Sequence, residues 1–147
     1  MTEAIHVTCP HCHSRNRLSR ERLNDRPNCG KCRQPLFTGS PVTLTENNYA
    51  NHVTGTDLPV LLDCWAPWCG PCRSFAPVFE EAARQYEPSL RLAKLDTEAY
   101  PQLASRLGIR SIPTLILFRN GKEVARQSGA LPPAMLREWL SSHGITD

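Results

Sequence analysis

Six of the seven cysteines in this 147-residue chain form three Cys-x-x-Cys pairs. Two sulfurs at this spacing either contribute to a metal site or interconvert between dithiol and disulfide. The residues around each pair must therefore distinguish the two chemistries. The pairs lie in TCPHC, NCGKC and WCGPC, and they comprise Cys9 and Cys12, Cys29 and Cys32, and Cys69 and Cys72.

The first two pairs are predicted to bind zinc. Sixteen residues separate them, which is within the range of tetrahedral zinc sites, and Pro10 and Gly30 suit tight turns that direct N–H groups at the sulfurs. Residues 1–37 hold too few large apolar side chains to fold without such a staple. Four thiolates complete the coordination of the metal, which predicts one structural Zn²⁺. Its expected ligands are Cys9, Cys12, Cys29 and Cys32.

Other chemistries for this segment stay open. His11 or His13 could replace one of the thiolates, and the two pairs could instead be additional redox dithiols. Zinc-bound thiolates can also be oxidised with release of the metal. The segment could therefore act as a redox sensor or as the switch of a zinc-gated chaperone.

The third pair lies where the apolar run LPVLLDCW ends and a helical pattern begins. Free N–H groups and the helix dipole at such a junction stabilise a thiolate, so we expect Cys69 to be a nucleophile near neutral pH. Cys72, one turn later, is placed to resolve a mixed disulfide. Pro71 suits the first helical turn. Because His143 is the only histidine or cysteine after Cys72, a second zinc site is not expected here.

The hydrophobic pattern predicts an α/β fold around this pair. Near-continuous apolar runs indicate covered strands, a stripe from Phe75 to Tyr86 indicates a helix, and Asn120-Gly121 between two strand-like runs indicates a hairpin. This order predicts a mixed five-stranded sheet with helices on both faces. The expected strands are 42–45, 58–65, 90–96 and the two arms of 114–129, and the expected helices are 47–53, one following Cys72, 100–108 and 132–144.

The charge distribution divides the chain in two. Residues 1–40 carry a net charge of +4 and the remainder −1, and Gly, Ser and Pro punctuate residues 37–42. We predict a zinc-binding module at 1–37, a linker at 38–42 and a larger domain at 43–147. No aromatic residues interleave the arginines of RNRLSRERL, so we expect a solvated loop or a protein-docking face there, and no nucleic-acid partner.

The sequence predicts a cytoplasmic protein. It contains neither an apolar run of membrane-spanning length nor a signal-peptide pattern, so no membrane association is expected. An odd number of cysteines also excludes a fully paired disulfide framework within one chain, which favours a reducing compartment. We expect a monomer.

The motif WCGPC after LLDCWA, with SIPTLILFRNG and SGA downstream, resembles the thioredoxin family over residues 42–147. With four cysteines upstream, the whole chain resembles the zinc-bearing thioredoxin 2 branch. The resemblance implies a thioredoxin fold of five strands and four helices after a small zinc ribbon. It also implies a protein-disulfide reductase that acts on oxidised proteins, is recharged by NADPH-dependent thioredoxin reductase and binds no organic cofactor.

The resemblance assigns roles to further residues. Asp63 matches a buried carboxylate that accepts the proton of Cys72, and burial in an apolar strand would raise its pKa. Lys94 matches a lysine near that carboxylate, and Pro113 matches a cis-proline facing the disulfide. The plainer alternatives are a strand-end cap or ion pair for Asp63, a solvated lysine, and an ordinary proline at a strand start.

The resemblance also implies a substrate groove beside the disulfide. The groove residues implied are Trp68, Gly70, Pro71, Ile112, Pro113, Gly129 and Ala130.

Cys64 departs from the aromatic residue of many relatives. We expect a buried small hydrophobe there in preference to a regulatory thiol.

A different class of function also stays open. In it, the zinc module recruits a specific partner and the larger domain is a passenger.

Overall fold

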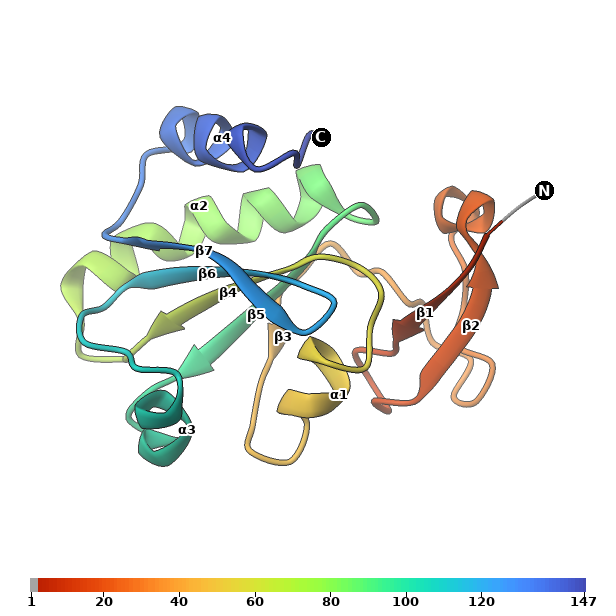
Figure 1. Ribbon diagram of the computed structural model, residues 1–147, viewed down its shortest axis with the longest axis horizontal. Helices are drawn as coiled ribbons and strands as arrows, with labels where there is room; N and C mark the ends of the chain where they lie inside the picture. The colour runs from red at the N-terminus through yellow and green to blue at the C-terminus, as the bar shows by residue number, and fades with distance from the viewer. Residues whose placement is uncertain (1–2) are drawn as a thin grey trace.

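The computed structural model describes residues 3–147, which form two sheets (Figure 1). A small antiparallel sheet of β1 (Ala4–Thr8) and β2 (Arg15–Ser19) precedes a 3-10 helix, η1 (Arg20–Asp25). A five-stranded sheet follows in the order β3-β5-β4-β6-β7. Its strands are β3 (Val42–Thr43), β4 (Val60–Trp65), β5 (Arg91–Asp96), β6 (Thr114–Arg119) and β7 (Lys122–Ser128), and the helices are α1 (Tyr49–Val53), α2 (Gly70–Tyr86), α3 (Pro101–Arg106) and α4 (Pro133–Ser142).

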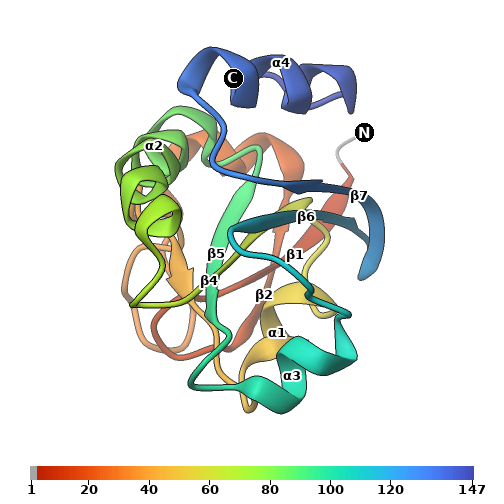
Figure 2. The same ribbon diagram turned by 90° about the vertical axis from the view of Figure 1, so that its left-hand side faces the viewer.

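The central strand β4 is covered on both faces, as its near-continuous apolar sequence predicts. Alternate residues of a strand point to opposite faces, and here they enter two separate cores. Leu61 packs with side chains of α2 and α4, whereas Leu62 and Cys64 pack with Val53 and Leu103 from the side of α1 and α3. Figure 2 shows these two helix pairs on opposite sides of the sheet. The predicted layering is confirmed.

The sheet is mixed, also as predicted. β3, β5 and β4 run parallel, β6 is antiparallel to β4, and β7 returns from β6 as a hairpin. Asn120 and Gly121 at the hairpin tip have φ values of 53° and 78°. A two-residue turn with both φ values positive matches the twist of the strands, which explains the Asn-Gly pair.

β3, α1 and the segment RNRLSRERL differ from expectation in length or type. β3 spans two residues rather than four, and α1 is confined to Tyr49–Val53 because Asn48 bonds back to Thr43 and Thr45 before the helix begins. RNRLSRERL is not a solvated loop: it forms β2 and η1, because β1 supplies a ladder partner from Ala4 to Thr8.

The N-terminal ribbon, residues 3–36, packs against one end of the large sheet. Its core includes Ile5, Val7 and Leu36, and it also takes in Leu58, which lies just before β4. The ribbon therefore lies at the end where β4 begins, on the right of Figure 1, whereas α2 begins at the opposite end. None of the helices in the described part of the chain has the length and apolarity needed to span a bilayer.

Candidate active site and metal centre

Cys69 and Cys72 are joined by a disulfide at the start of α2. Cys69 is the N-cap of this helix, and the N–H of Cys72 donates to its Sγ at 3.2 Å. Pro71 occupies the first turn, where a missing N–H costs no hydrogen bond. After reduction, the same N–H and the helix dipole would favour a thiolate at Cys69.

Burial does not separate the two sulfurs, because Cys69 is 4% exposed and Cys72 is 2% exposed. Both lie in a small cluster with Ala66, against which Trp65 and Ile112 pack. What distinguishes them is the helix cap, since Cys69 accepts the N–H of Cys72 whereas Cys72 is already inside the helix. The difference in chemistry therefore depends on backbone geometry.

The loop before β6 and the loop after β7 meet beside the disulfide. Cys69 Sγ lies 3.8 Å from the carbonyl oxygen of Ile112, the Ile112–Pro113 peptide bond is cis, and Gly129 N–H donates to the Pro113 carbonyl at 2.8 Å. Gly129 has φ 102°, which favours glycine, and open space where a side chain would lie. Ala130, Gly70 and Pro71 are exposed.

Trp68 is the most exposed large apolar side chain of the described residues, at 68%. It directly precedes Cys69 in the chain, on the loop between β4 and α2. An exposed aromatic ring beside a buried disulfide offers a contact surface to a partner, because covering the ring would remove its apolar surface from water.

Asp63 is a buried carboxyl group without a partner. Both side-chain oxygens lack a hydrogen bond, which excludes the strand-cap and ion-pair alternatives within the described chain. Burial raises its pKa from the ordinary 3.8 to about 7, although the positive charge of Lys94 opposes the shift. Lys94 is its register partner in β5, and Lys94 Nζ lies 4.7 Å from the centre of the Trp65 ring. An unsatisfied buried acid that titrates near neutrality is typical of a functional site.

Cys64 lies on the opposite face of β4 from Asp63. It is fully buried among the side chains near α1 and α3, and burial raises the pKa of its thiol to about 12. A protonated, inaccessible thiol behaves as a small hydrophobe, as expected for this position.

The four N-terminal cysteines converge on one point. Their Sγ atoms all lie within 4.8 Å of one another, and the sulfurs approach across the two turns at 3.6 Å, Cys9 to Cys32 and Cys12 to Cys29. A tetrahedral zinc ion with Zn–S bonds of about 2.3 Å needs sulfurs about 3.8 Å apart. The donor set and its spacing therefore fit Zn²⁺.

Backbone N–H groups point at the sulfurs in both turns, as predicted. Cys9 Sγ accepts from the N–H of His11 at 3.3 Å and Cys12 at 3.5 Å, and Cys29 Sγ accepts in the same way from Lys31 and Cys32. Burial raises the pKa of Cys29, but these donors and the Asn16 amide outweigh it and bring the pKa to about 6. The second turn thus favours the thiolate that a metal requires, whereas at Cys9 burial outweighs the equivalent N–H donors and raises the pKa to about 11.

Neither neighbouring histidine joins this cluster, so the alternative ligand sets find no support. His11 is exposed, and the His13 ring nitrogen Nδ1 lies 2.8 Å from Nε2 of His52 in α1. His52 is buried, and burial lowers its pKa to about 3, so its ring is neutral. The contact joins the ribbon to the larger domain, and it was not predictable from the sequence because it depends on how the two parts pack.

A buried arginine is the second feature that sequence reasoning missed. Arg91, at the start of β5, is 2% exposed and pairs with Glu87 at 2.9 Å. Its Nη2 donates to the carbonyl oxygens of Thr8 at 3.1 Å and Leu36 at 2.9 Å, both in the ribbon. Its guanidinium also lies over the Phe37 ring. Polar and apolar residues alternate in RLAKLD, and Arg91 falls on a polar position. The pattern therefore does not indicate that this side chain is buried and anchors the ribbon.

The comparisons with known proteins agree with this architecture. The family model described as "Thioredoxin" matches residues 40–142, and the model described as "Thioredoxin 2, N-terminal" matches residues 8–34. Thioredoxin C-3 of Corynebacterium nephridii is 47% identical over 134 residues, covering 91% of this chain and 92% of that protein. Thioredoxin 1 of Nostoc sp. is 47% identical over 100 residues, covering 68% and 94%.

Among solved structures, the Malassezia sympodialis thioredoxin (Mala s 13) superposes with a TM-score of 0.66 at 33% identity, covering 74% of this chain and 94% of that one. The chain belongs to the thioredoxin family, whose members are thiol-disulfide oxidoreductases, and it carries the N-terminal ribbon of the thioredoxin 2 type.

Proposed function

We propose that this protein reduces disulfide bonds in oxidised proteins, with Cys69 as the attacking and Cys72 as the resolving cysteine. The observation that carries the proposal is the helix-cap position of Cys69, whose sulfur receives the N–H of Cys72 at 3.2 Å. A thiolate is the form that attacks a disulfide, and this cap favours it.

The proposed cycle exchanges two electrons. The Cys69 thiolate attacks one substrate sulfur, forms a mixed disulfide and expels the other sulfur as a thiolate, which takes a proton from water. Cys72 loses its proton and attacks Cys69 Sγ, and the second substrate sulfur leaves as a thiol or thiolate. The substrate disulfide is thereby reduced to two thiols, and the protein ends as the Cys69–Cys72 disulfide.

Asp63 is the proposed acceptor for the Cys72 proton. Its unpartnered carboxylate faces the side of the sheet on which α2 packs, and a pKa of about 7 lets it take and release protons at neutral pH. Lys94 is proposed as a positioning residue, because its charge holds the pKa of Asp63 lower than burial alone would.

We propose that the substrate chain lies extended beside the disulfide. The exposed Trp68 ring and the open surface at Gly129 and Ala130 would contact it, with Ile112 and Pro113 beside the sulfur. Thioredoxin reductase is the proposed source of electrons, with NADPH as the donor, and a reducing compartment such as the cytoplasm is the proposed location.

Zn²⁺ is the proposed metal of the ribbon, held by Cys9, Cys12, Cys29 and Cys32. With four sulfur ligands the metal staples the ribbon and leaves no position for water. The ribbon lies at the end of β4 remote from the disulfide, about 20 Å along a six-residue strand, so the metal has no proposed role in the exchange step.

Reduction of insulin disulfides by dithiothreitol tests the proposal. Wild type should accelerate it, and Cys69→Ser should reduce the catalysed rate by at least about 100-fold. Reduced Cys72→Ser, mixed with insulin after removal of dithiothreitol, should accumulate a mixed disulfide because the resolving thiol is missing. Cys64→Ala is the matched control, because this buried thiol lies outside the proposed chemistry and its removal should leave the rate unchanged. Equal rates for wild type and Cys69→Ser would contradict the proposal.

A second measurement tests the electron source. Insulin, thioredoxin reductase and NADPH are combined with the wild-type chain, and oxidation of NADPH is followed. Sustained oxidation that needs both Cys69 and Cys72 supports recharging by that enzyme. Activity with dithiothreitol but not with the reductase would support the exchange chemistry and contradict the proposal that thioredoxin reductase is the partner.

A further inference from the structure

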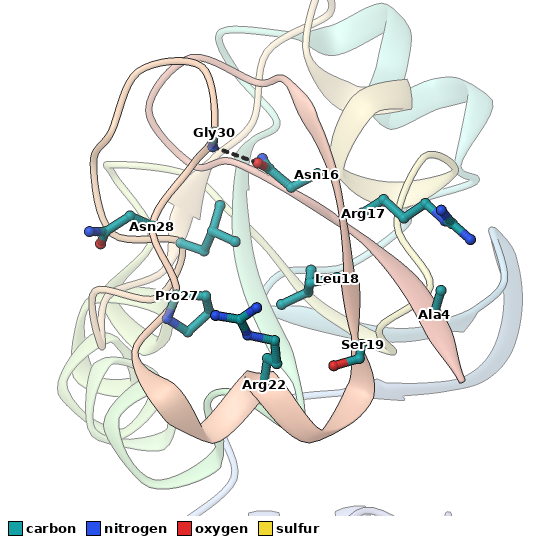
Figure 3. A pocket seen from close by; sticks show the side chains of 10 residues that line it. Ala4, Asn16, Arg17, Leu18, Ser19, Arg22, Pro27, Asn28 and Gly30 are labelled. Atoms are coloured by element: carbon teal, nitrogen blue, oxygen red, sulfur yellow. Dashed lines mark hydrogen bonds between the residues drawn. The ribbon is translucent and has the colours of Figure 1, made fainter. Parts of the chain in front are cut away.

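The ribbon carries a groove of about 580 Å³ that the disulfide chemistry does not use (Figure 3). It lies between β2 and the segment of the second zinc turn from Pro27 to Gly30. Leu18 and Leu36 supply apolar surface within it. The Asn16 side chain accepts a hydrogen bond from Gly30 N–H at 2.8 Å and links the two walls, while η1 lies across the other end.

One wall of this groove is an unpaired strand edge. β2 has β1 as its single neighbour in the described sheet. Main-chain bonds from Cys9 to Ser14 and from Arg20 to Glu3 flank the ladder, and antiparallel pairing alternates between bonded and non-bonded residues. Arg17, midway along β2, therefore directs its N–H and C=O away from β1 and toward the groove.

The groove is also positively charged. The Arg22 side chain extends from η1 toward Pro27 across it. Neither Arg22 nor Arg17 has an ion pair or side-chain hydrogen bond within residues 3–147, unlike the neighbouring Arg20, which pairs with Glu3. Residues 1–40 carry a net charge of +4, which a zinc ion with four thiolate ligands lowers to about +2. A free strand edge beside the free guanidinium group of Arg22 is complementary to an extended anionic chain, whereas the Arg17 side chain points away from the groove.

We propose that this groove binds an extended acidic peptide segment of a partner protein. The segment adds to β2 as a third strand through the N–H and C=O of Arg17, and one of its carboxylates pairs with Arg22. Because the ribbon lies at the opposite end of β4 from the disulfide, such a segment is a docking element and is not the cystine being reduced.

Fluorescence anisotropy on the full, zinc-loaded chain tests the charge requirement. The probe is a labelled heptapeptide alternating valine and glutamate, and the comparison probe carries lysine in place of glutamate. We expect the acidic probe alone to bind. Arg22→Ala should weaken it about tenfold, the loss of one charge-assisted hydrogen bond. Arg20→Ala removes the same charge from the same helix outside the groove and should change binding less than twofold.

The strand edge is tested with Arg17→Pro and Arg17→Ala. Proline removes the outward N–H without touching the ladder to β1, so it should abolish binding while the alanine variant retains most of it. Zinc content and the amide spectrum of each variant establish that the ribbon is folded. In wild type, the probe should shift amide signals of β2 and residues 27–30 and leave those near Cys69 unmoved.

Three outcomes would overturn the proposal. One is equal weakening by Arg20→Ala and Arg22→Ala, which would indicate a diffuse charge effect. Another is amide shifts centred on the disulfide. The third is equal or tighter binding of a single-stranded oligouridine with the same dependence on Arg22, which would indicate a nucleic-acid surface.

Discussion

The ribbon and the active site use the same short motif and diverge immediately after it. In all three Cys-x-x-Cys turns the first sulfur accepts the N–H of the second cysteine, at 3.5 Å for Cys9 and Cys29 and at 3.2 Å for Cys69. The residue after each second cysteine also bonds back to the carbonyl of the first. Local geometry up to that point is nearly the same.

The conformation of the residue directly after the second cysteine decides whether the pair joins a metal site or forms a disulfide. His13 and Arg33 adopt φ values of 64° and 69° and turn the chain back, whereas Arg73 continues into the 17-residue α2. Returning turns bring two pairs together, so sulfurs from different motifs meet at 3.6 Å. A continuing helix isolates its pair, so Cys69 and Cys72 bond to each other. The chemistry of a Cys-x-x-Cys turn is therefore determined by the conformation of the chain that follows it.

Removing the metal is the most severe test of whether the ribbon and the active site are independent. Chelation of zinc, or Cys29→Ser, should unfold the ribbon, because zinc binding stabilises such modules by about 10–16 kcal/mol. Insulin reduction should persist, since the active pair depends on α2. Amide spectra and the insulin assay on one sample check both outcomes. Loss of activity together with the ribbon would show that the two regions are coupled.

Arg91→Met should cost about 3–5 kcal/mol of unfolding free energy in urea, because it leaves Glu87 buried without its partner and two ribbon carbonyls without a donor. Adding Glu87→Gln should recover part of the loss. Arg84→Met is the control: its exposed pair with Glu81 should contribute less than about 1 kcal/mol. Equal losses of unfolding free energy in Arg91→Met and Arg84→Met would contradict the role of Arg91 as an anchor of the ribbon.

Asp63 should make stability depend on pH. The folded protein holds a proton between about pH 4 and 7 that the unfolded chain has released, because burial raises the pKa of Asp63 from 3.8 to about 7. The unfolding free energy should therefore fall as pH rises through this window, by up to about 4 kcal/mol, and change no further above it.

Urea unfolding of Asp63→Asn at several pH values measures this contribution. The variant should lose the slope and be more stable than wild type at pH 8. Asp57→Asn is the comparison, because hydrogen bonds from His6 lower the pKa of Asp57 and its titration falls below the window. A slope that persists in Asp63→Asn would mean that another group carries it.

Lys94→Met should have the smallest effect. Without its charge the pKa of Asp63 should rise further, moving the pH dependence of insulin reduction upward by less than about one unit. Lys122→Met, on the exposed hairpin, should leave the profile in place. A downward shift would contradict the proposed role of Lys94.

Features encoded within a few residues were predictable from sequence. The Asn120-Gly121 turn, the covered strand β4 and the N–H groups around the zinc-site sulfurs are of this kind, since each depends on local backbone chemistry. Arg91 and the His13–His52 contact were not predictable, because they exist only where the ribbon meets the sheet. The linker at 38–42 and the separate roles of Cys69 and Cys72 stay predictions.

The docking of the ribbon at the beginning of β4 has a practical consequence for handling the protein. Attachment to a bead or an electrode through the N-terminal side of the ribbon would leave the Trp68 face pointing into solution, because the two lie at opposite ends of the sheet. Immobilised in that way, the chain should retain its turnover. Attachment through an engineered site near Ala130 should obstruct it.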